Sequence, residues 1–349
     1  LSRAGSFGDA TRRSEGRFPS LLRRSSRRLT THPGAHQLKN LHMGEASARP
    51  RVRELVINWH ITEACNFSCR YCYAKWDGTE KELIHDWERT QKLLSEIASF
   101  FAPSNLSNPL QQALSWSAVR LNLAGGEPLL YPKAVLRVLA EARSLGMHTS
   151  IITNGTRITE EFLDQLAPLV SMIGVSIDAA SDATNVGIGR VDRRGSLLNN
   201  QELARLLAKA RTINPGLHVK LNTVVNALNA EGDMGNTIDT FRPDRWKIFR
   251  MLPVVTGDLA VSSEVFEAFI ARHARYKGVM CVEDNDVMSE SYLMLDPLGR
   301  FFQNSRGQQG YSYSQPVDVV GATQAFTDWR FAVGSFASRY SHSSNGAVR

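Results

Sequence analysis

The sequence predicts an α/β fold, a partial, open (β/α)6 barrel followed by a C-terminal extension. From residue 55 onward, short β-rich runs alternate with helical patterns, as in folds with a parallel sheet. Six such strand–helix units fit in roughly 200 residues, and a complete eight-stranded barrel would leave too little chain for the rest. Polar and glycine-rich segments follow successive strands, at the edge where barrels of parallel strands carry out their chemistry.

The predicted strands and helices alternate regularly along the chain. The strands are expected at 55–61, 119–123, 148–153, 171–177, 217–225 and 245–250. The helical patterns occupy 82–101, 133–146, 159–168, 199–212 and 230–241. Residues 52–251 would therefore form the barrel. Residues 252–349, rich in Gly and Ser and without a strong repeat, would form an extension that covers its active-site face.

Composition and charge limit the class of protein. With 42% hydrophobic and 21% charged residues, the chain has the composition of a globular protein. It lacks an apolar run of the ~18 residues that a membrane-spanning helix needs, so we expect no transmembrane segment. The formal net charge of +7 lies entirely in residues 1–42, which hold nine Lys or Arg and two Asp or Glu. Because the remainder is neutral overall, no direct nucleic-acid binding is expected.

Residues 1–48 form a basic segment rich in Arg, Ser, Gly and Pro. Without long apolar periodicity this segment cannot bury enough surface to fold alone, so we expect a disordered tail. Its composition is also that of a transit peptide. Alternatively, Met43 lies just before the first predicted strand and would be the true start, with the upstream residues assigned to the gene in error.

The four cysteines predict a metal or redox site. Cys65, Cys69 and Cys72 lie in one CxxxCxxC segment, whereas Cys281 is isolated. A disulfide framework would need dispersed pairs, so this usage indicates a reducing compartment and a cytoplasmic protein. Three thiolates on one loop can ligate three irons of a [4Fe–4S] cubane and leave the fourth iron open for a bidentate ligand. A structural zinc site is the alternative, and it would need a fourth ligand such as His60 or Cys281.

The cysteine segment resembles the signature of the radical S-adenosylmethionine (SAM) superfamily. A second segment, Gly125-Gly126-Glu127-Pro128 after the second predicted strand, is similar to the superfamily's GGEP motif. Alone, a Gly-Gly pair before Glu-Pro would indicate only a turn. The resemblance implies that SAM binds the open iron, and that the backbone of Gly125 and Gly126 and the carboxylate of Glu127 receive its methionine amine.

A narrower resemblance extends over most of residues 55–310. The chain is similar to the viperin family in six segments that keep the family's order and spacing, at 58–62, 176–178, 185–190, 220–226, 245–249 and 291–296. That resemblance implies a SAM-dependent nucleotide dehydratase in antiviral defence. Its substrate would be a nucleoside triphosphate (CTP, UTP or GTP), converted to the 3′-deoxy-3′,4′-didehydro analogue by radical abstraction of the ribose 4′ hydrogen. An electron donor such as flavodoxin or ferredoxin is also implied.

The viperin resemblance implies roles for individual residues. Ser176 and Arg190 would hold the SAM carboxylate, which suits a hydroxyl and a guanidinium fork, and Asn154 would contact SAM near its sugar. Tyr292 would be catalytic and help to quench the product radical, although its own sequence context is that of an ordinary half-buried strand. Cations on one face suit a polyanion. The residues implied to bind the triphosphate are Arg120, Lys220, Asn222, Arg245 and Lys247.

The C-terminus departs from the viperin pattern. The family carries a stretch similar to Arg-Gly-Gly-x-Tyr-x-Trp that closes over the nucleotide, and residues 331–340 of this chain do not match it. Arg339 is the candidate replacement for this clamp. Cys281 is expected to be a small buried apolar residue.

Two other functions stay open at this point. One is a radical SAM enzyme that modifies peptides or makes a cofactor, although many such enzymes carry further cysteines for auxiliary clusters. The other is a non-catalytic metal-binding scaffold that interacts through the basic tail. The scaffold predicts zinc or no metal, and no cleavage of SAM.

Overall fold

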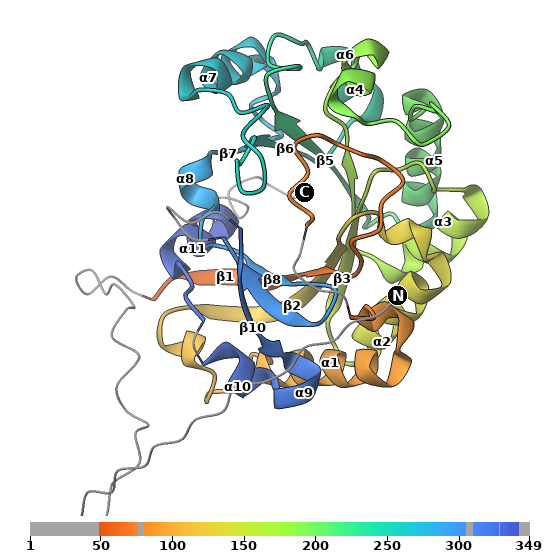
Figure 1. The fold of residues 1–349 in the computed structure, drawn as a ribbon. Coiled ribbons are helices and arrows are strands. Elements are labelled where there is room, and N and C mark those ends of the chain that lie inside the picture. Colours follow the sequence, from red (N-terminus) through yellow and green to blue (C-terminus); the bar gives the residue numbers. More distant parts are fainter. Residues whose placement is uncertain (1–48, 76–79, 305–309, 328, 342–349) are drawn as a thin grey trace, which may run out of the picture. The chain divides into compact units, whose positions relative to one another are not determined.

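The computed structural model describes residues 49–75, 80–304, 310–327 and 329–341 (Figure 1). The predicted basic tail at 1–48 lies outside these ranges, as do residues 342–349 of the predicted extension. Among the described residues, no helix is both long enough and apolar enough to cross a membrane.

The described chain forms a ten-stranded sheet in the order β10-β9-β8-β1-β2-β3-β4-β5-β6-β7. Strands β1 to β7 run parallel, β8 is parallel to β1, and β9 and β10 are antiparallel additions. The strands are β1 (Arg51–His60), β2 (Ser115–Ala124), β3 (His148–Thr153), β4 (Met172–Ser176), β5 (His218–Val225), β6 (Arg245–Arg250), β7 (Met280–Glu283), β8 (Leu293–Leu295), β9 (Arg300–Gln303) and β10 (Ser312–Pro316). Because β7 and β10 stand at opposite edges, the barrel is open, and the predicted fold class is confirmed.

All six predicted strands are present as β1 to β6. The parallel sheet continues further than predicted, because β7 and β8 extend it on both sides. These two strands are only four and three residues long. Runs that short carry no readable alternation, so their place in the sheet comes from pairing with β6 and β1.

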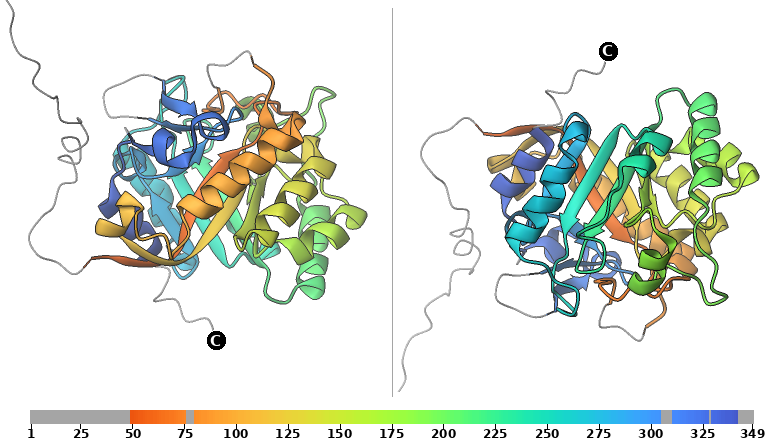
Figure 2. Two further views of the ribbon diagram at one scale, coloured as in Figure 1. Left: turned by 90° about the horizontal axis from the view of Figure 1, so that it is seen from below. Right: turned by 90° about the horizontal axis from the view of Figure 1, so that it is seen from above.

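Helices lie on the outer side of the curved sheet (Figures 1 and 2). The longer helices are α1 (Trp87–Phe100), α2 (Pro132–Ser144), α3 (Glu160–Leu166), α4 (Asp182–Ile188), α5 (Asn200–Ile213), α6 (Gly235–Phe241), α7 (Ser263–Arg272) and α11 (Val333–Ser341). The short ones are α8 (Asn285–Met288), α9 (Val317–Val320), α10 (Ala322–Phe326), and the 3₁₀ turns η1 (Leu83–His85), η2 (Pro109–Gln112), η3 (Pro128–Leu130), η4 (Ala167–Leu169) and η5 (Ala274–Tyr276).

Polar caps set where several predicted helices begin. The side chains of Asp86, Thr159 and Asn199 accept backbone N–H groups in the first turns of α1, α3 and α5. The helix predicted at 230–241 is shorter, because α6 begins only at Gly235. In the preceding turn the Asn229 side chain accepts the Asn226 N–H and donates to the Val224 carbonyl, and such local bonds compete with helix formation.

The strands alternate so that apolar side chains face the helices and polar ones face inward. In β2, Val119, Leu121 and Leu123 belong to the buried core, whereas Arg120 and Asn122 line an internal cavity. A complete barrel of this kind fills its interior with branched apolar side chains. Here the polar interior leaves room for ligands.

The C-terminal segment packs onto the beginning of the chain. The ring centroid of Phe301 in β9 lies 6.2 Å from that of Phe101 after α1, 5.3 Å from that of Phe326 in α10 and 5.7 Å from that of Trp329. Helix α11 packs against β1. The aromatic pairs at 100–101 and 301–302 are thus buried core residues.

We predict that Phe301→Ala lowers the free energy of unfolding by about 3–5 kcal/mol, because it empties the aromatic cluster that joins α1 to the C-terminal segment. Urea unfolding followed by circular dichroism measures this. Val319→Ala is the control, since Val319 is 63% exposed and its truncation should change the free energy by less than about 0.5 kcal/mol. Equal effects of the two substitutions would contradict the packing role of Phe301.

Candidate active site

The polar inner face of the sheet encloses a cavity of about 290 Å³. Its wall includes strand residues from β1 to β8 and part of the segment that follows β1, residues 61–75, which we name the cysteine loop. Of all the residues predicted for the site, Glu127 alone does not line the cavity. The predicted residues that do line it are Cys65, Cys69, Cys72, Arg120, Gly125, Gly126, Asn154, Ser176, Arg190, Lys220, Asn222, Arg245, Lys247 and Tyr292.

Close backbone contacts hold the cysteine loop on two sides. The Gly126 N–H donates to the Thr62 carbonyl over 2.7 Å, and the Ser68 N–H donates to the Gly189 carbonyl over 3.1 Å. A Cβ atom on Gly126 would lie 2.3 Å from the carbonyl oxygen of Ala64, and one on Gly189 would lie 2.3 Å from that of Ser68. Only glycine permits backbones to approach so closely. Both glycines therefore fix the position of the loop.

The three loop cysteines fit an iron–sulfur cluster better than a single metal ion. Burial raises the pKa of all three thiols, that of Cys69 to about 12, so metal ligation would have to displace their protons. No three His, Cys, Asp or Glu side chains among the described residues are placed to hold one metal ion, as structural zinc requires. A cubane does not need such convergence, since each thiolate binds a different iron.

The carboxylate of Glu127 is buried beside the cavity and hydrogen-bonded. One oxygen accepts from the Thr153 hydroxyl over 2.7 Å and the Leu129 N–H over 2.9 Å, and the other accepts from the Asn154 N–H over 2.6 Å. Burial raises its pKa. The side chain of Asn154 in turn donates to Asn66 of the cysteine loop over 2.8 Å. Glu127 therefore joins the GGEP segment to the end of β3, and a direct contact with SAM stays a prediction.

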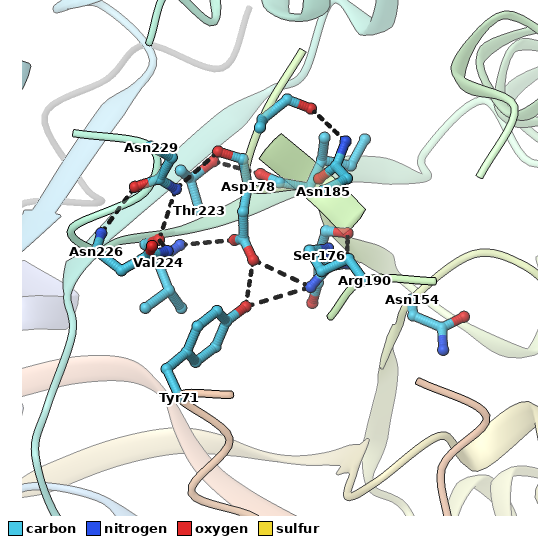
Figure 3. Close-up of polar contacts among 12 residues, drawn as sticks. Tyr71, Asn154, Ser176, Asp178, Asn185, Arg190, Thr223, Val224, Asn226 and Asn229 are labelled. Carbon is cyan, nitrogen blue, oxygen red and sulfur yellow. Dashed lines mark hydrogen bonds and ion pairs between the residues drawn. The ribbon is translucent and has the colours of Figure 1, made fainter. Parts of the chain in front are cut away.

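Arg190 lies where β4 ends, in a network that Figure 3 shows. Its guanidinium donates to the carboxylate of Asp178 over 3.2 Å, to the hydroxyl of Tyr71 over 3.3 Å and to the carbonyl of Ser176. Both predicted carboxylate-binding residues thus lie together, as the resemblance implied. The carboxylate at Asp178 and the phenol at Tyr71 were given no role from the sequence.

The cavity is also lined by the four cations predicted to bind the triphosphate, Arg120, Lys220, Arg245 and Lys247, and by Arg250 and Arg339. Arg120 pairs with Glu54 over 2.8 Å, and Lys247 pairs with Glu283 over 2.8 Å. The Lys220 ammonium, by contrast, makes no hydrogen bond or ion pair with any of the described residues. An ammonium group that lacks a carboxylate partner among other cations is suited to an anionic ligand.

Two features of the cavity wall explain where the Lys220 side chain lies and why its pKa is low. The register of the sheet places it between Gly174 on β4 and Arg245 on β6, and a Cβ atom on Gly174 would lie 3.0 Å from the Lys220 side chain. Gly174 thus makes room for the lysine. Burial, together with the charges of Lys247, Arg120 and Arg245, lowers the pKa of Lys220 well below its usual value. A negatively charged ligand nearby would raise the pKa of Lys220 again.

Tyr292 is held by charged groups. Its hydroxyl donates to Glu283 and accepts from Lys247 over 3.0 Å, and the guanidinium carbon of Arg339 lies 3.9 Å from the centroid of its ring. Although burial alone would raise it, Lys247 and Arg339 hold the pKa of Glu283 below its usual value. Burial and the charge of Glu283 raise the pKa of Tyr292 well above 10. The phenol is therefore protonated and its direction is fixed.

The structure places Arg339 and Cys281 in surroundings that the sequence did not predict. Arg339 donates to the Ser291 carbonyl over 2.6 Å and the Val287 carbonyl over 2.7 Å, and pairs with Glu283 over 2.8 Å. These contacts place it in the cavity wall, and its role as a replacement for the clamp stays a prediction. Cys281 is not a buried apolar residue. It is half-buried, lines the cavity, and stands opposite Lys247 in the sheet.

Residues 59–226 match the sequence profile of the Radical SAM superfamily. A protein of Psychrobacter lutiphocae named S-adenosylmethionine-dependent nucleotide dehydratase is 41% identical over 292 residues, which cover 84% of this chain and 96% of that protein. A protein of Pseudoalteromonas ulvae with the same name is 40% identical over 291 residues, which cover 83% of this chain and 94% of that protein.

Solved structures resemble the fold at low sequence identity. The structure titled "Native anSMEcpe with bound AdoMet" superimposes with a TM-score of 0.56 at 13% identity, and the match covers 78% of this chain and 80% of that one. A likeness at this identity supports the fold alone.

We predict that Gly126→Ala lowers the iron content of the reconstituted protein, because the added Cβ atom forces the cysteine loop away from its contacts at Thr62 and Ala64. Iron and sulfide analysis after anaerobic reconstitution measures the loss. Gly278→Ala is the matched control, since a Cβ atom there meets open space. Normal iron loading of Gly126→Ala would show that the loop does not depend on this contact.

Proposed function

Because the chain belongs to the radical SAM superfamily and within it to the S-adenosylmethionine-dependent nucleotide dehydratases, we propose that it dehydrates a nucleoside triphosphate (CTP, UTP or GTP). The product would be the 3′-deoxy-3′,4′-didehydro analogue. When bound, the cluster and SAM supply a 5′-deoxyadenosyl radical that removes the ribose 4′ hydrogen. The protein contributes the position of the ribose and a site closed to water.

The cysteines and the β3–β4 edge would hold the cofactors. Cys65, Cys69 and Cys72 would ligate three irons of a [4Fe–4S] cluster and leave one iron for SAM. Arg190 and Ser176 would bind the SAM carboxylate, since a guanidinium fork and a hydroxyl both donate to it. The backbone carbonyls of the GGEP segment would accept hydrogen bonds from the SAM amine, and Glu127 would lie behind them. Asn154 would lie near the sugar.

The Lys220 side chain, which has no carboxylate partner among the described residues, is the observation that carries the nucleotide proposal. Arg120 and Lys247 also line the cavity, and with Lys220 they outnumber their paired carboxylates, Glu54 and Glu283. A triphosphate would supply the remaining counter-charge. A peptide of ordinary composition would leave the amine of Lys220 desolvated and unpaired, which is costly.

Strand register gives the direction of the nucleotide. Ser176 pairs with Asn222, and Asn222 pairs with Lys247, in one row across the sheet. Lys220 and Arg245 stand two residues earlier on the same strands, so the phosphates would lie deeper than this row. The ribose would lie at the row itself, next to SAM. The buried Asn222 Oδ1 has no hydrogen-bond partner and would accept from a ribose hydroxyl.

The proposal also includes Tyr292, the reductant and the outer segments. The Tyr292 phenol, held by Glu283 and Lys247, would help to quench the product radical by giving one electron to the sugar and one proton to the departing 3′ hydroxyl, which leaves as water. A flavodoxin or ferredoxin would supply electrons. We propose a reducing, cytoplasmic setting and a role in antiviral defence. A division at residue 251 between barrel and covering extension is supported by Arg339, which reaches the cavity from the extension.

The test is an anaerobic assay on reconstituted protein with dithionite and SAM. Each of CTP, UTP, GTP and ATP is offered separately, and mass spectrometry quantifies 5′-deoxyadenosine and the nucleotide. We expect one triphosphate to stimulate 5′-deoxyadenosine formation and to yield a product lighter by one water. SAM cleavage that is indifferent to every nucleotide would contradict the proposed substrate, and iron-loaded protein that does not cleave SAM would contradict the enzyme.

We predict that triphosphate binding takes up a proton and weakens as pH rises, because the pKa of Lys220 is lowered in the free protein and the polyanion raises it. Calorimetry in buffers of different ionisation enthalpy measures the proton uptake. It is done above pH ~7.5, where the terminal phosphate is already ionised and takes up no proton itself. Lys220→Met should weaken binding about ten- to hundredfold. Lys220→Arg should bind with little pH dependence, since a guanidinium stays charged. The control is Lys133→Gln on the exposed surface, and an unchanged pH dependence in Lys220→Arg would contradict the assignment.

A further inference from the structure

The carboxylate of Asp178, just beyond β4, joins three segments of the site (Figure 3). One oxygen accepts the backbone N–H of Val224 in β5 over 2.9 Å. The other accepts the Tyr71 hydroxyl of the cysteine loop, and the Arg190 guanidinium over 3.2 Å. The Asp178 carbonyl also accepts the Asn229 side chain over 2.8 Å. Both ends of this residue are therefore fixed, the carboxylate to β5 and the carbonyl to the turn that follows β5.

Asp178 is 1% exposed and Arg190 is 6% exposed, so their ion pair is formed away from water. A buried carboxylate needs both a counter-charge and hydrogen bonds to its lone pairs, and Asp178 has them. Removing one partner from such a pair leaves a desolvated charge, which costs far more than the loss of a surface pair.

These contacts orient the guanidinium of Arg190. One terminal nitrogen donates to Asp178 and Tyr71, and the other donates to the Ser176 carbonyl. Since the guanidinium is planar, bonds at two nitrogens fix its plane. The ring of Phe67, also in the cysteine loop, lies 5.5 Å from the guanidinium carbon. The N–H groups that remain belong to a side chain that lines the cavity.

We infer that Asp178 is a positioning residue for SAM. It holds Arg190 so that the remaining N–H groups meet the SAM carboxylate, and through Tyr71 it fixes that guanidinium relative to the cysteine loop. The loop that carries the cluster ligands and the cation that binds SAM then keep one mutual position. This inference rests on the proposed contact between Arg190 and SAM, and it does not depend on the nucleotide substrate.

Asparagine cannot take over this role, although it has nearly the same shape. If its oxygen accepts the Val224 N–H, its amide N–H₂ faces the guanidinium of Arg190, which is a donor itself. If it is turned round, the amide faces the Val224 N–H instead. Either way two donors oppose each other, and the counter-charge of Arg190 is lost.

The experiment measures SAM affinity of the iron-loaded protein by equilibrium dialysis, without nucleotide. Asp178→Asn should weaken SAM binding by about ten- to hundredfold, the range for a hydrogen bond to a charged group. Tyr71→Phe removes one hydroxyl and leaves the ion pair, so it should weaken binding by less than about tenfold. In the double variant the two losses should not add, because both substitutions act on the position of the same guanidinium.

Two further readouts separate positioning from folding. The EPR signal of the reduced cluster, which changes when SAM binds, should need higher SAM concentrations in Asp178→Asn and reach the wild-type form at saturation. In turnover, KM for SAM should rise while kcat at saturating SAM changes little. Asp192→Asn is the matched control, since the Asp192 carboxylate bonds groups of its own turn, including the backbone N–H groups of Arg194 and Ser196, each over 2.8 Å.

Wild-type SAM affinity in Asp178→Asn would overturn the inference, as would an equal loss in Tyr71→Phe. A variant with low iron content and a lowered unfolding temperature would instead assign Asp178 a purely structural role, and this also overturns it. SAM affinity, iron content and unfolding temperature are all measured without a nucleotide, so these outcomes are independent of whether the triphosphate proposal succeeds.

Discussion

The inward-facing polar side of the parallel sheet is the constraint on which the rest of the site depends. Polar groups inside a protein need partners, and most here find them across neighbouring strands, as Asn122 does with Asn58 over 2.9 Å. Among the described residues of the cavity, the Lys220 ammonium and the Asn222 Oδ1 do not. Because parallel strands end at one edge, the cysteine loop, the GGEP segment and Arg190 lie around the same opening. The cavity is thus a consequence of strand alternation, and its unsatisfied groups define what it binds.

The sequence predicted the parts of the site that have local signals. Cysteine spacing, the glycine motif and the alternating strands each lie within a short segment, and fourteen of the fifteen predicted residues line the cavity. Glu127 shows the limit of such signals, since a motif gives a residue type but not the direction of its side chain. Asp178, Glu283 and Gly174 received no role, because their importance depends on strand register and on partners far away in sequence. Four-residue β7, which carries Glu283, gave no readable pattern.

Acidic residues of the protein hold cations in place in both halves of the cavity. Glu54 and Glu283 hold Arg120 and Lys247 at fixed positions, so that these cations need little rearrangement when an anion arrives. Lys220 has no such carboxylate partner among the described residues, and burial together with the neighbouring cations lowers its pKa. Near the cysteine loop, the carboxylate of Asp178 pairs with one edge of the Arg190 guanidinium. The two halves use the same principle, in which an acidic residue on the protein side fixes the cation that faces the ligand.

The cavity wall takes residues from both ends of the described chain, since α11 packs against β1 and Arg339 holds the turn before β8. Contacts between such distant segments form late, and during synthesis they must wait for the last helix to leave the ribosome. The cysteine loop and its glycine contacts lie within residues 61–189 and are complete earlier. A nascent chain would therefore have its metal ligands in place well before Tyr292 is held, which separates cluster assembly in time from the ability to turn over substrate.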